Sequence, residues 1–363
     1  MRKEVVIAIS VFILISAFAF QILSRGGHFS SFVYELIFNK ENIDLRKADS
    51  NVNVLLLGIG GGTHAGPNLT DTIIFASIDP NNNKLALVSI PRDLWAVDLK
   101  ARINTAYAKG EAKKTGGGLT LSKAVVKKVV NQPVDYALVI DFSGFVKIVD
   151  LLGGIDVDVE RSFDDYEYPV EGKEDDPCGN KEEDLDKLAT ASSQLEVFPC
   201  RYEHLHFDKG FKHMNGEEAL KYVRSRHAEG PEGTDFARSK RQEKIIEAVR
   251  SKALSLQILI NPAKIISLYQ TVQDSINTDV NQEEFDDFIK LAQKLDNAKI
   301  ESGVLDAGDE KQNREGLLIN PPISEEYNYE WTLIPRRGNG NFSEIHAYVL
   351  CLIKTGSCEI KKN

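Results

Sequence analysis

The feature that most constrains this chain is an apolar run of 19 residues near its N-terminus, over residues 5–23. As a helix, the run would span about 28 Å of hydrocarbon, which is enough for one membrane crossing. Arg2 and Lys3 precede it, and the positive-inside preference keeps such residues in the cytoplasm. We therefore predict a cytoplasmic stub at 1–4 and a single transmembrane anchor at 5–24.

A cleavable signal peptide ending after Ala19 is the alternative, because small residues at that point suit a cleavage site. The apolar run continues to Leu23, which favours an uncleaved anchor. Either interpretation exports the protein. We predict a single-pass protein of the cell membrane, in contact with the lipid bilayer, whose C-terminal domain is extracytoplasmic. The remaining organisation that we predict is a linker at 25–50, a folded domain at 51–350 and a tail at 351–363.

The charge balance excludes one class of partner. The chain has 44 Lys and Arg against 54 Asp and Glu, a net charge of −10. Such a field disfavours non-specific binding to nucleic acid, so we predict no nucleic-acid partner. Any anion site must therefore be a local basic cluster.

The chain has four cysteines, and an even number in an exported protein predicts two disulfides. Cys178 and Cys200 flank an acidic segment, and Cys351 and Cys358 lie close together. Which cysteines pair is left open. Zinc is the alternative, but the chain has no C-x-x-C pair and no histidine at ligand spacing to the cysteines. The acidic segment, about 163–205, is predicted to be a surface insertion.

The strand and helix signals alternate along the domain. Four runs rich in apolar and β-branched residues predict strands, and the second and third form a hairpin: 52–59, 72–79, 84–90 and 135–142. Their near-continuous apolarity indicates that both faces are covered, which predicts a three-layer α/β/α fold with a mixed central sheet. Four segments have helical spacing: 121–131, 143–152, 236–256 and 281–295. The C-terminal region reads as β-like to about residue 350.

Basic residues gather in two neighbouring segments. In YVRSR, an extended strand would place Arg224 and Arg226 on the same side. The next helix opens at or near Asp235. Helical spacing then places three polar side chains on one face: Arg238, Arg241 and Gln242. A charged helix end that only forms surface salt bridges is the alternative to a binding site.

The predicted hairpin brings two acids to the same region. Asp71 begins one strand and Asp93 follows the end of its partner, so the two carboxylates become neighbours and require a proton or a cation between them. Arg92 lies beside Asp93, and Arg102 and Asn104 follow shortly. Two acids suit a hard cation, and several arginines suit an anion with many oxygens. We therefore predict a phosphoryl-transfer site in which Asp71 and Asp93 bind Mg²⁺ (or Mn²⁺).

The motifs resemble those of the LytR-CpsA-Psr family of membrane-anchored cell-envelope phosphotransferases. The resemblance covers residues 52 to about 254 in the family's order and spacing, with a looser match beyond residue 276. Its motifs are VNVLLLGIGGG, LTDTIIF, VSIPRDLWAVDL, RINTAYAKG, LLGGIDVDV, MNGEEALKYVRSRH and DFARSKRQ.

The resemblance implies an activity. Such proteins take a glycan linked through pyrophosphate to a polyprenyl lipid and pass the phospho-glycan to a peptidoglycan hydroxyl. A pyrophosphatase that uses water instead is one alternative, and a non-catalytic envelope-binding or regulatory protein is another. The resemblance also implies a mixed sheet and an apolar tunnel for the prenyl chain, for which a stripe of Ile245, Ile246 and Val249 is a candidate.

The resemblance also implies residue roles. Asp71 and Asp93 would bind the metal and, with Arg92 and Arg224, form the catalytic set. The predicted substrate-binding residues are Arg102, Asn104, Arg226, Asp235, Arg238, Arg241 and Gln242, with Asp235 orienting the arginines and with Asn104 and Arg241 as the weaker candidates. One departure is Leu69, where many members of the family carry arginine.

Overall fold

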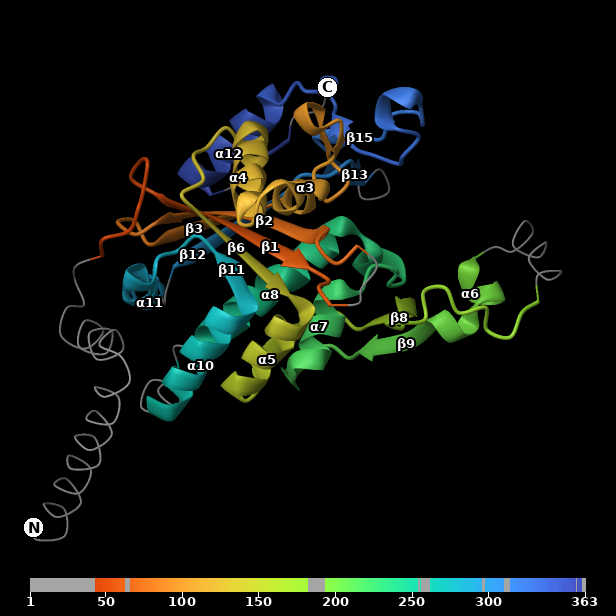
Figure 1. The fold of residues 1–363 in the computed structure, drawn as a ribbon, viewed down its shortest axis with the longest axis horizontal. Coiled ribbons are helices and arrows are strands. Elements are labelled where there is room, and N and C mark those ends of the chain that lie inside the picture. Colours follow the sequence, from red (N-terminus) through yellow and green to blue (C-terminus); the bar gives the residue numbers. More distant parts are fainter. Residues whose placement is uncertain are drawn as a thin grey trace, which may run out of the picture.

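The centre of the molecule is a six-stranded mixed sheet with the strand order β11-β6-β1-β2-β3-β12 (Figure 1). The computed structural model describes residues 43–62, 66–181, 193–253, 255, 262–295, 298–309, 314–356 and 358–360. The strands of the sheet are β1 (Val52–Ile59), β2 (Thr70–Asp79), β3 (Lys84–Ser89), β6 (Tyr136–Asp141), β11 (Ile276–Thr278) and β12 (Lys299–Val304). The predicted strands and the mixed sheet are confirmed.

The directions of the strands bring several strand ends together at one edge of the sheet, where a ligand site can form. β1 pairs in parallel with β6, and β3 pairs in parallel with β12. β2 lies between β1 and β3 and is antiparallel to both. The carboxyl ends of β6, β1, β3 and β12 therefore meet at one edge, and the first residues of β2 join them there. Crevices at the carboxyl ends of strands are the usual ligand sites of α/β sheets.

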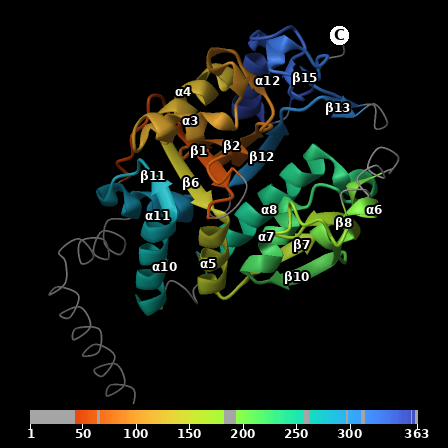
Figure 2. The same ribbon diagram turned by 45° about the vertical axis from the view of Figure 1, so that its right-hand side comes forward.

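Helices cover both faces of the sheet (Figures 1 and 2). The helices on one face are α3 (Thr105–Lys113), α4 (Gly117–Val130) and α12 (Ser343–Thr355). Those on the other face include α5 (Phe142–Leu152), α8 (Asp235–Ala253), α10 (Pro262–Ser275) and α11 (Phe285–Lys294). The arrangement is the predicted α/β/α layering.

The sequence of strand β1 is apolar throughout because both faces of the strand are packed against helices. Leu55 and Leu57 pack into the core beneath α4 and α12, whereas Val54 and Leu56 pack into the core beside α11. Successive side chains of a strand point to opposite faces, so a strand between two helical layers needs apolar residues at both parities.

Two parts of the predicted boundaries need correction. Residues 343–355, expected to be β-like as far as residue 350 and a tail beyond it, form helix α12. Its core-facing residues Ile345, Val349 and Leu352 have helical spacing. Helices α3 and α10, which begin at Thr105 and Pro262, have no counterpart among the predicted helices.

The end of the predicted linker at 25–50 packs on the domain. Leu45 is buried. The backbone N–H of Arg46 donates to Tyr136 Oη at 2.5 Å, and its guanidinium carbon lies 4.3 Å from the centre of that ring. Arg46 Nε also lies 3.1 Å from Glu284 Oε1. The predicted anchor at 5–24 is outside the described residues, and none of the helices described here has the length and apolarity that a membrane crossing requires.

The acidic insertion begins and ends in a two-stranded arm (Figure 1). β8 (Phe163–Pro169) pairs with β9 (Tyr202–Phe207) in antiparallel fashion, and the short helix α6 (Gln194–Val197) lies toward the tip. A disulfide between Cys178 and Cys200, with Cα atoms 5.5 Å apart, closes the excursion.

The second disulfide joins Cys351 to Cys358, with Cα atoms 6.1 Å apart, and fixes the end of α12. Both predicted disulfides are confirmed, and the structure settles which cysteines pair.

We predict that Val349→Ala lowers the free energy of unfolding by about 2 kcal/mol, because it leaves a cavity beneath α12. Val349 is fully buried, and its neighbour Leu350 is exposed. The matched change Leu350→Ala should stay within about 0.5 kcal/mol of wild type in chemical denaturation. Equal effects of the two changes would mean that α12 is not part of the core.

Candidate functional site

Two carboxylates share one guanidinium at the carboxyl edge of the sheet. Arg92 Nη1 donates to Asp71 Oδ1, and Arg92 Nε lies 3.6 Å from Asp93 Oδ2. Burial alone lowers the pKa of Arg92, but its hydrogen bond to Asp71 and the charges of both acids raise that pKa overall. The hairpin thus brings the two predicted acids together around a cation that the chain itself supplies.

A second arginine extends the pair. Strand β5 (Ala101–Arg102) pairs with β4 (Trp95–Ala96), and this pairing directs Arg102 back toward the end of β3. Arg102 Nη1 donates to Asp93 Oδ1 at 3.0 Å, and Arg102 Nε lies 3.3 Å from Glu330 Oε2. Asp93 therefore faces two guanidiniums.

Asn104 links the start of β2 to this pair through its backbone. Its N–H donates to the carbonyl oxygen of Arg92 at 3.2 Å, and its own carbonyl oxygen accepts from Thr70 N–H at 3.1 Å. The Asn104 side chain is buried, and its Oδ1 has no hydrogen-bond partner among the described residues.

Arg224 and Arg226 do not lie on a strand, contrary to the prediction. Arg224 is the last residue of helix α7 (Gly216–Arg224), so the period-two argument does not apply to the pair. The Arg224 guanidinium lies over the ring of Phe142, 4.0 Å from its centre, immediately after β6. Arg224 is therefore at the carboxyl edge of the sheet, but it stacks on an aromatic ring, and the described residues include no carboxylate paired with it.

The loop after α7 holds Arg226 against a buried acid. Asp165 Oδ2 accepts from Ser225 Oγ at 2.6 Å and from the backbone N–H groups of Arg226 and His227 at 3.2 Å each. Asp165 is fully buried. One residue of the predicted surface insertion is therefore not at the surface, since Asp165 is buried and positions the loop.

Arg226 interacts electrostatically with two other arginines of the site, Arg92 and Arg238. Burial, followed by the positive charges of Arg238 and Arg92, lowers the pKa of Arg226 to about 10, and Asp235 and Asp93 oppose that change. Arg226 is thus close enough to Arg238 and Arg92 for their positive charges to act on it in a partly desolvated space. An anion placed among them would relieve their mutual repulsion.

The start of helix α8 supplies the remaining predicted residues. Thr234 Oγ1 accepts from Ala237 N–H at 3.1 Å and caps the helix. Asp235 Oδ1 lies 2.8 Å from Arg238 Nη2, which orients that guanidinium. One turn later, Gln242 Nε2 donates to Thr72 Oγ1 at 3.3 Å, beside Asp71.

Arg241 lies beneath the loop that carries Arg226, and its guanidinium binds that loop instead of facing Asp71 and Asp93. It is buried, and its guanidinium donates to the carbonyl oxygens of Tyr222, Ser225 and Glu232 at 2.7–3.0 Å. It also pairs with the Glu232 carboxylate at 3.0 Å. Helical spacing alone does not reveal this, because the loop closes over the same face of α8. We therefore assign Arg241 a positioning role in place of the predicted contact with substrate.

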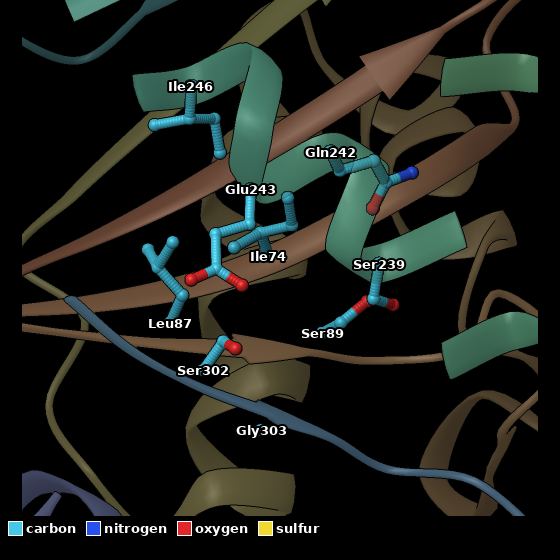
Figure 3. A pocket seen from close by; sticks show the side chains of 9 residues that line it. All are labelled: Ile74, Leu87, Ser89, Ser239, Gln242, Glu243, Ile246, Ser302 and Gly303. Atoms are coloured by element: carbon cyan, nitrogen blue, oxygen red, sulfur yellow. The ribbon is translucent and has the colours of Figure 1, made fainter. Parts of the chain in front are cut away.

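A pocket continues from Gln242 between α8 and the sheet (Figure 3). Ser89 and Ser239 lie at its polar end, where Ser239 Oγ donates to Ser89 Oγ at 2.9 Å. The apolar end is lined by Ile74, Leu87 and Ile246. Of the predicted tunnel stripe, Ile246 lines this pocket, whereas Ile245 and Val249 pack into a separate core with β7 (Ile155–Val159).

Three residues of this region were missed by sequence reasoning. Asp165 was hidden in the acidic segment, Glu330 lies in the C-terminal region, and Thr72 reads as an ordinary strand residue. Only Thr72 carried a signal, since it follows Asp71 directly.

The LytR_cpsA_psr family model matches residues 33–320 of the chain. The polyisoprenyl-teichoic acid–peptidoglycan teichoic acid transferase TagU of Bacillus cereus is 30% identical over 255 residues, which make up 69% of this chain and 67% of that protein. The similarly named transferase TagV of Bacillus subtilis is 28% identical over 269 residues, 72% of this chain and 56% of that protein.

The fold is also found in solved structures. The Lin1025 protein from Listeria innocua aligns with a TM-score of 0.55 and 24% sequence identity, and the alignment covers 85% of this chain and 98% of that one. This likeness concerns the fold.

We predict that Asp165→Asn speeds hydrogen exchange at the amides of Arg226 and His227 by about tenfold or more. The change removes the charge of the acceptor that both amides bind, and hydrogen bonds to charged groups are worth about 1.5–3 kcal/mol. The neighbouring change Asp164→Asn is the control, because Asp164 binds exposed His204 and His206 on the arm. Unchanged exchange in Asp165→Asn would show that Asp165 does not hold the loop.

Proposed function

We propose that this chain, which belongs to the LytR_cpsA_psr family, is a transferase. It moves a phospho-glycan from a polyprenyl-pyrophosphate carrier to a peptidoglycan hydroxyl. The similar proteins TagU and TagV are named as transferases from a polyisoprenyl carrier to peptidoglycan. The observation that carries the proposal for this chain is the cluster of Arg92, Arg226 and Arg238 beside Asp71 and Asp93. The glycopolymer itself is not specified by these residues.

The arginines suit the pyrophosphate of the carrier. Guanidiniums bind phosphate oxygens in bidentate fashion. Burial first, and then the positive charges of Arg238 and Arg92, lower the pKa of Arg226, and an anion would relieve the repulsion among these charges. Arg102 and Gln242 border the same space, and Arg224 lies at the same edge of the sheet. Positioning and charge neutralisation supply most of the catalysis in phosphoryl transfer.

The acids fit a divalent cation. Asp71 and Asp93 offer hard carboxylate oxygens, and the buried Oδ1 of Asn104 is an acceptor without a hydrogen-bond partner among the described residues. Mg²⁺ prefers such oxygen ligands. A bound Mg²⁺ would neutralise charge on the pyrophosphate, and Asp71 and Asp93 would hold it there, with Mn²⁺ as a substitute.

In the reaction, an acceptor hydroxyl attacks the phosphorus that carries the glycan, and the bond from that phosphorus to the bridging oxygen breaks. Polyprenyl phosphate leaves with the bond's electron pair, and the hydroxyl proton passes to a carboxylate. Asp71 is the better candidate for this base, since its side chain is 27% exposed and that of Asp93 is 11% exposed.

The pocket beside α8 provides the entry for the prenyl chain. Its volume is about 20 Å³, which is far below the roughly 300–1,000 Å³ of typical ligand pockets. Glu243 also projects into it (Figure 3). Binding a long chain therefore requires α8 to move away from β2 and β3. An anchor at residues 5–24, which we retain as part of the proposal, would keep the active edge near its lipid substrate.

We predict that Arg226→Ala slows transfer by about a hundredfold or more, on the scale of losing one transition-state donor. Its unfolding midpoint should be unchanged, because desolvation already disfavours the Arg226 charge in the folded protein. The control is Arg337→Ala, which removes an exposed arginine paired with Glu344. Transfer at the wild-type rate in Arg226→Ala would remove this arginine from the mechanism.

We predict that chelation of divalent metal stops transfer. Asp71→Asn and Asp93→Asn should each raise the Mg²⁺ concentration for half-maximal rate by about tenfold or more, because each removes one charged ligand. Asp98→Asn, at an exposed ion pair with Lys128, is the control. Metal-independent activity of the wild-type protein would contradict the metal role.

Mass analysis of the products separates the alternatives. With a short polyprenyl-pyrophosphate glycan, Mg²⁺ and peptidoglycan oligomers, we expect a phosphodiester between the two glycans. A free glycan phosphate without that diester would indicate a pyrophosphatase, and an unchanged donor would indicate a binding or regulatory protein.

A further inference from the structure

Two aromatic side chains stand in solvent beside the carboxylate–arginine cluster. Tyr329 is 70% exposed and Trp331 is 50% exposed. We call this pair the aromatic strip. Ile319 and Ile323, which precede it in the chain, are also exposed. The strip lies beyond residues 33–320, the range of the family match, and the mechanism proposed above does not use it.

The backbone beneath the strip is held in place. Tyr327 packs edge-on against Trp95, with ring centres 5.3 Å apart. Asn328 Nδ2 donates to the carbonyl oxygen of Lys100 at 3.0 Å, and Tyr329 N–H donates to the carbonyl oxygen of Ser324 at 2.9 Å. The exposed rings are thus presented on a fixed segment, so a ligand would meet them with little ordering cost.

The residues between and after the two rings contact the cluster. Glu330 pairs with Arg102, which in turn binds Asp93. Thr332 Oγ1 and Leu333 N–H both donate to the carbonyl oxygen of Asp93, at 2.8 and 3.0 Å. A molecule lying on the strip would therefore extend to the place where the phosphoryl group is transferred.

We propose that the aromatic strip binds the acceptor glycan, with the sugar rings stacked on Tyr329 and Trp331. The C–H bonds on one face of a pyranose ring carry partial positive charge, and the face of an aromatic ring is negative. Exposed Glu325 and Glu326, with Glu330, supply acceptors for sugar hydroxyl and N-acetyl N–H groups. This inference rests on the proposed function.

The charge of the segment selects among possible occupants. Three glutamates in six residues, 325–330, would repel a polyanionic donor glycopolymer and the anionic surface of a membrane, which attracts basic segments. A neutral, N-acetylated glycan has no such penalty. The strip therefore suits the acceptor side of the reaction.

Intrinsic fluorescence tests the proposal directly. The chain has two tryptophans, of which Trp95 is buried, so a ligand in contact with solvent-facing indole reports on Trp331. The probe is a neutral tetrasaccharide of β-linked N-acetylglucosamine, titrated into the full chain without donor. We expect saturable quenching.

Tyr329→Ala should raise the dissociation constant of the tetrasaccharide by about tenfold, the scale of a strong aromatic contact. Phe211→Ala is the matched control, because it removes a largely exposed ring from β10 (Gly210–Met214), which pairs with β7 away from the sheet. Calorimetry should show that Trp331→Ala weakens binding of the tetrasaccharide as much as Tyr329→Ala does.

Three results would overturn the proposal: no binding of the tetrasaccharide to the wild-type chain, equal binding by the Tyr329→Ala and wild-type chains, or tighter binding of a polyanionic glycan than of the neutral one. Because the titration contains no donor, it succeeds or fails independently of transfer. Conversely, loss of transfer in Arg226→Ala with tetrasaccharide binding retained would separate the two sites.

Discussion

The ion pairs of Arg92 with Asp71 and Asp93 are the interaction on which the site depends. They exist because β2 runs antiparallel between β1 and β3, so its first residues meet the residues after β3. Two carboxylates at this spacing require a cation, and the chain provides one in its own guanidinium. A metal ion can take the place of Arg92 beside the carboxylates, because both are cations. A pyrophosphate can take the place of the carboxylates beside Arg92, because both are anions.

Around this pair, the molecule concentrates positive charge despite its net charge of −10. Arg226, Arg238 and Arg102 come from three separate segments, and each is held by an acid or by a loop that an acid fixes: Asp165 behind Arg226, Asp235 beside Arg238 and Asp93 beside Arg102. The acids thus orient the arginines without cancelling the positive charge that the arginines present to a ligand. Burial, and after it the positive charges of Arg238 and Arg92, lower the pKa of Arg226 in this arrangement.

The features that sequence patterns predicted are those with short-range causes. The β2–β3 hairpin and the helix with Arg238 and Gln242 follow from local periodicity, and they were enough to place Asp71 near Arg92 and Asp93. Features that depend on distant contacts were missed or misassigned. The pattern around Asp165 does not reveal its burial, because its partners lie 60 to 62 residues further along the chain. The spacing of Arg241 predicts a contact with substrate, because the pattern does not show the loop that closes over it. The YVRSR segment predicts a strand, whereas in the structure helix α7 continues through Arg224.

The proposed mechanism requires this edge of the sheet to bind a pyrophosphate between the arginines and the acids. The most direct measurement is calorimetric titration of a short-chain polyprenyl pyrophosphate into the full chain, with and without Mg²⁺. We expect saturable one-to-one binding that Mg²⁺ tightens and that added salt weakens. The absence of binding, or an affinity indifferent to both Mg²⁺ and salt, would contradict it.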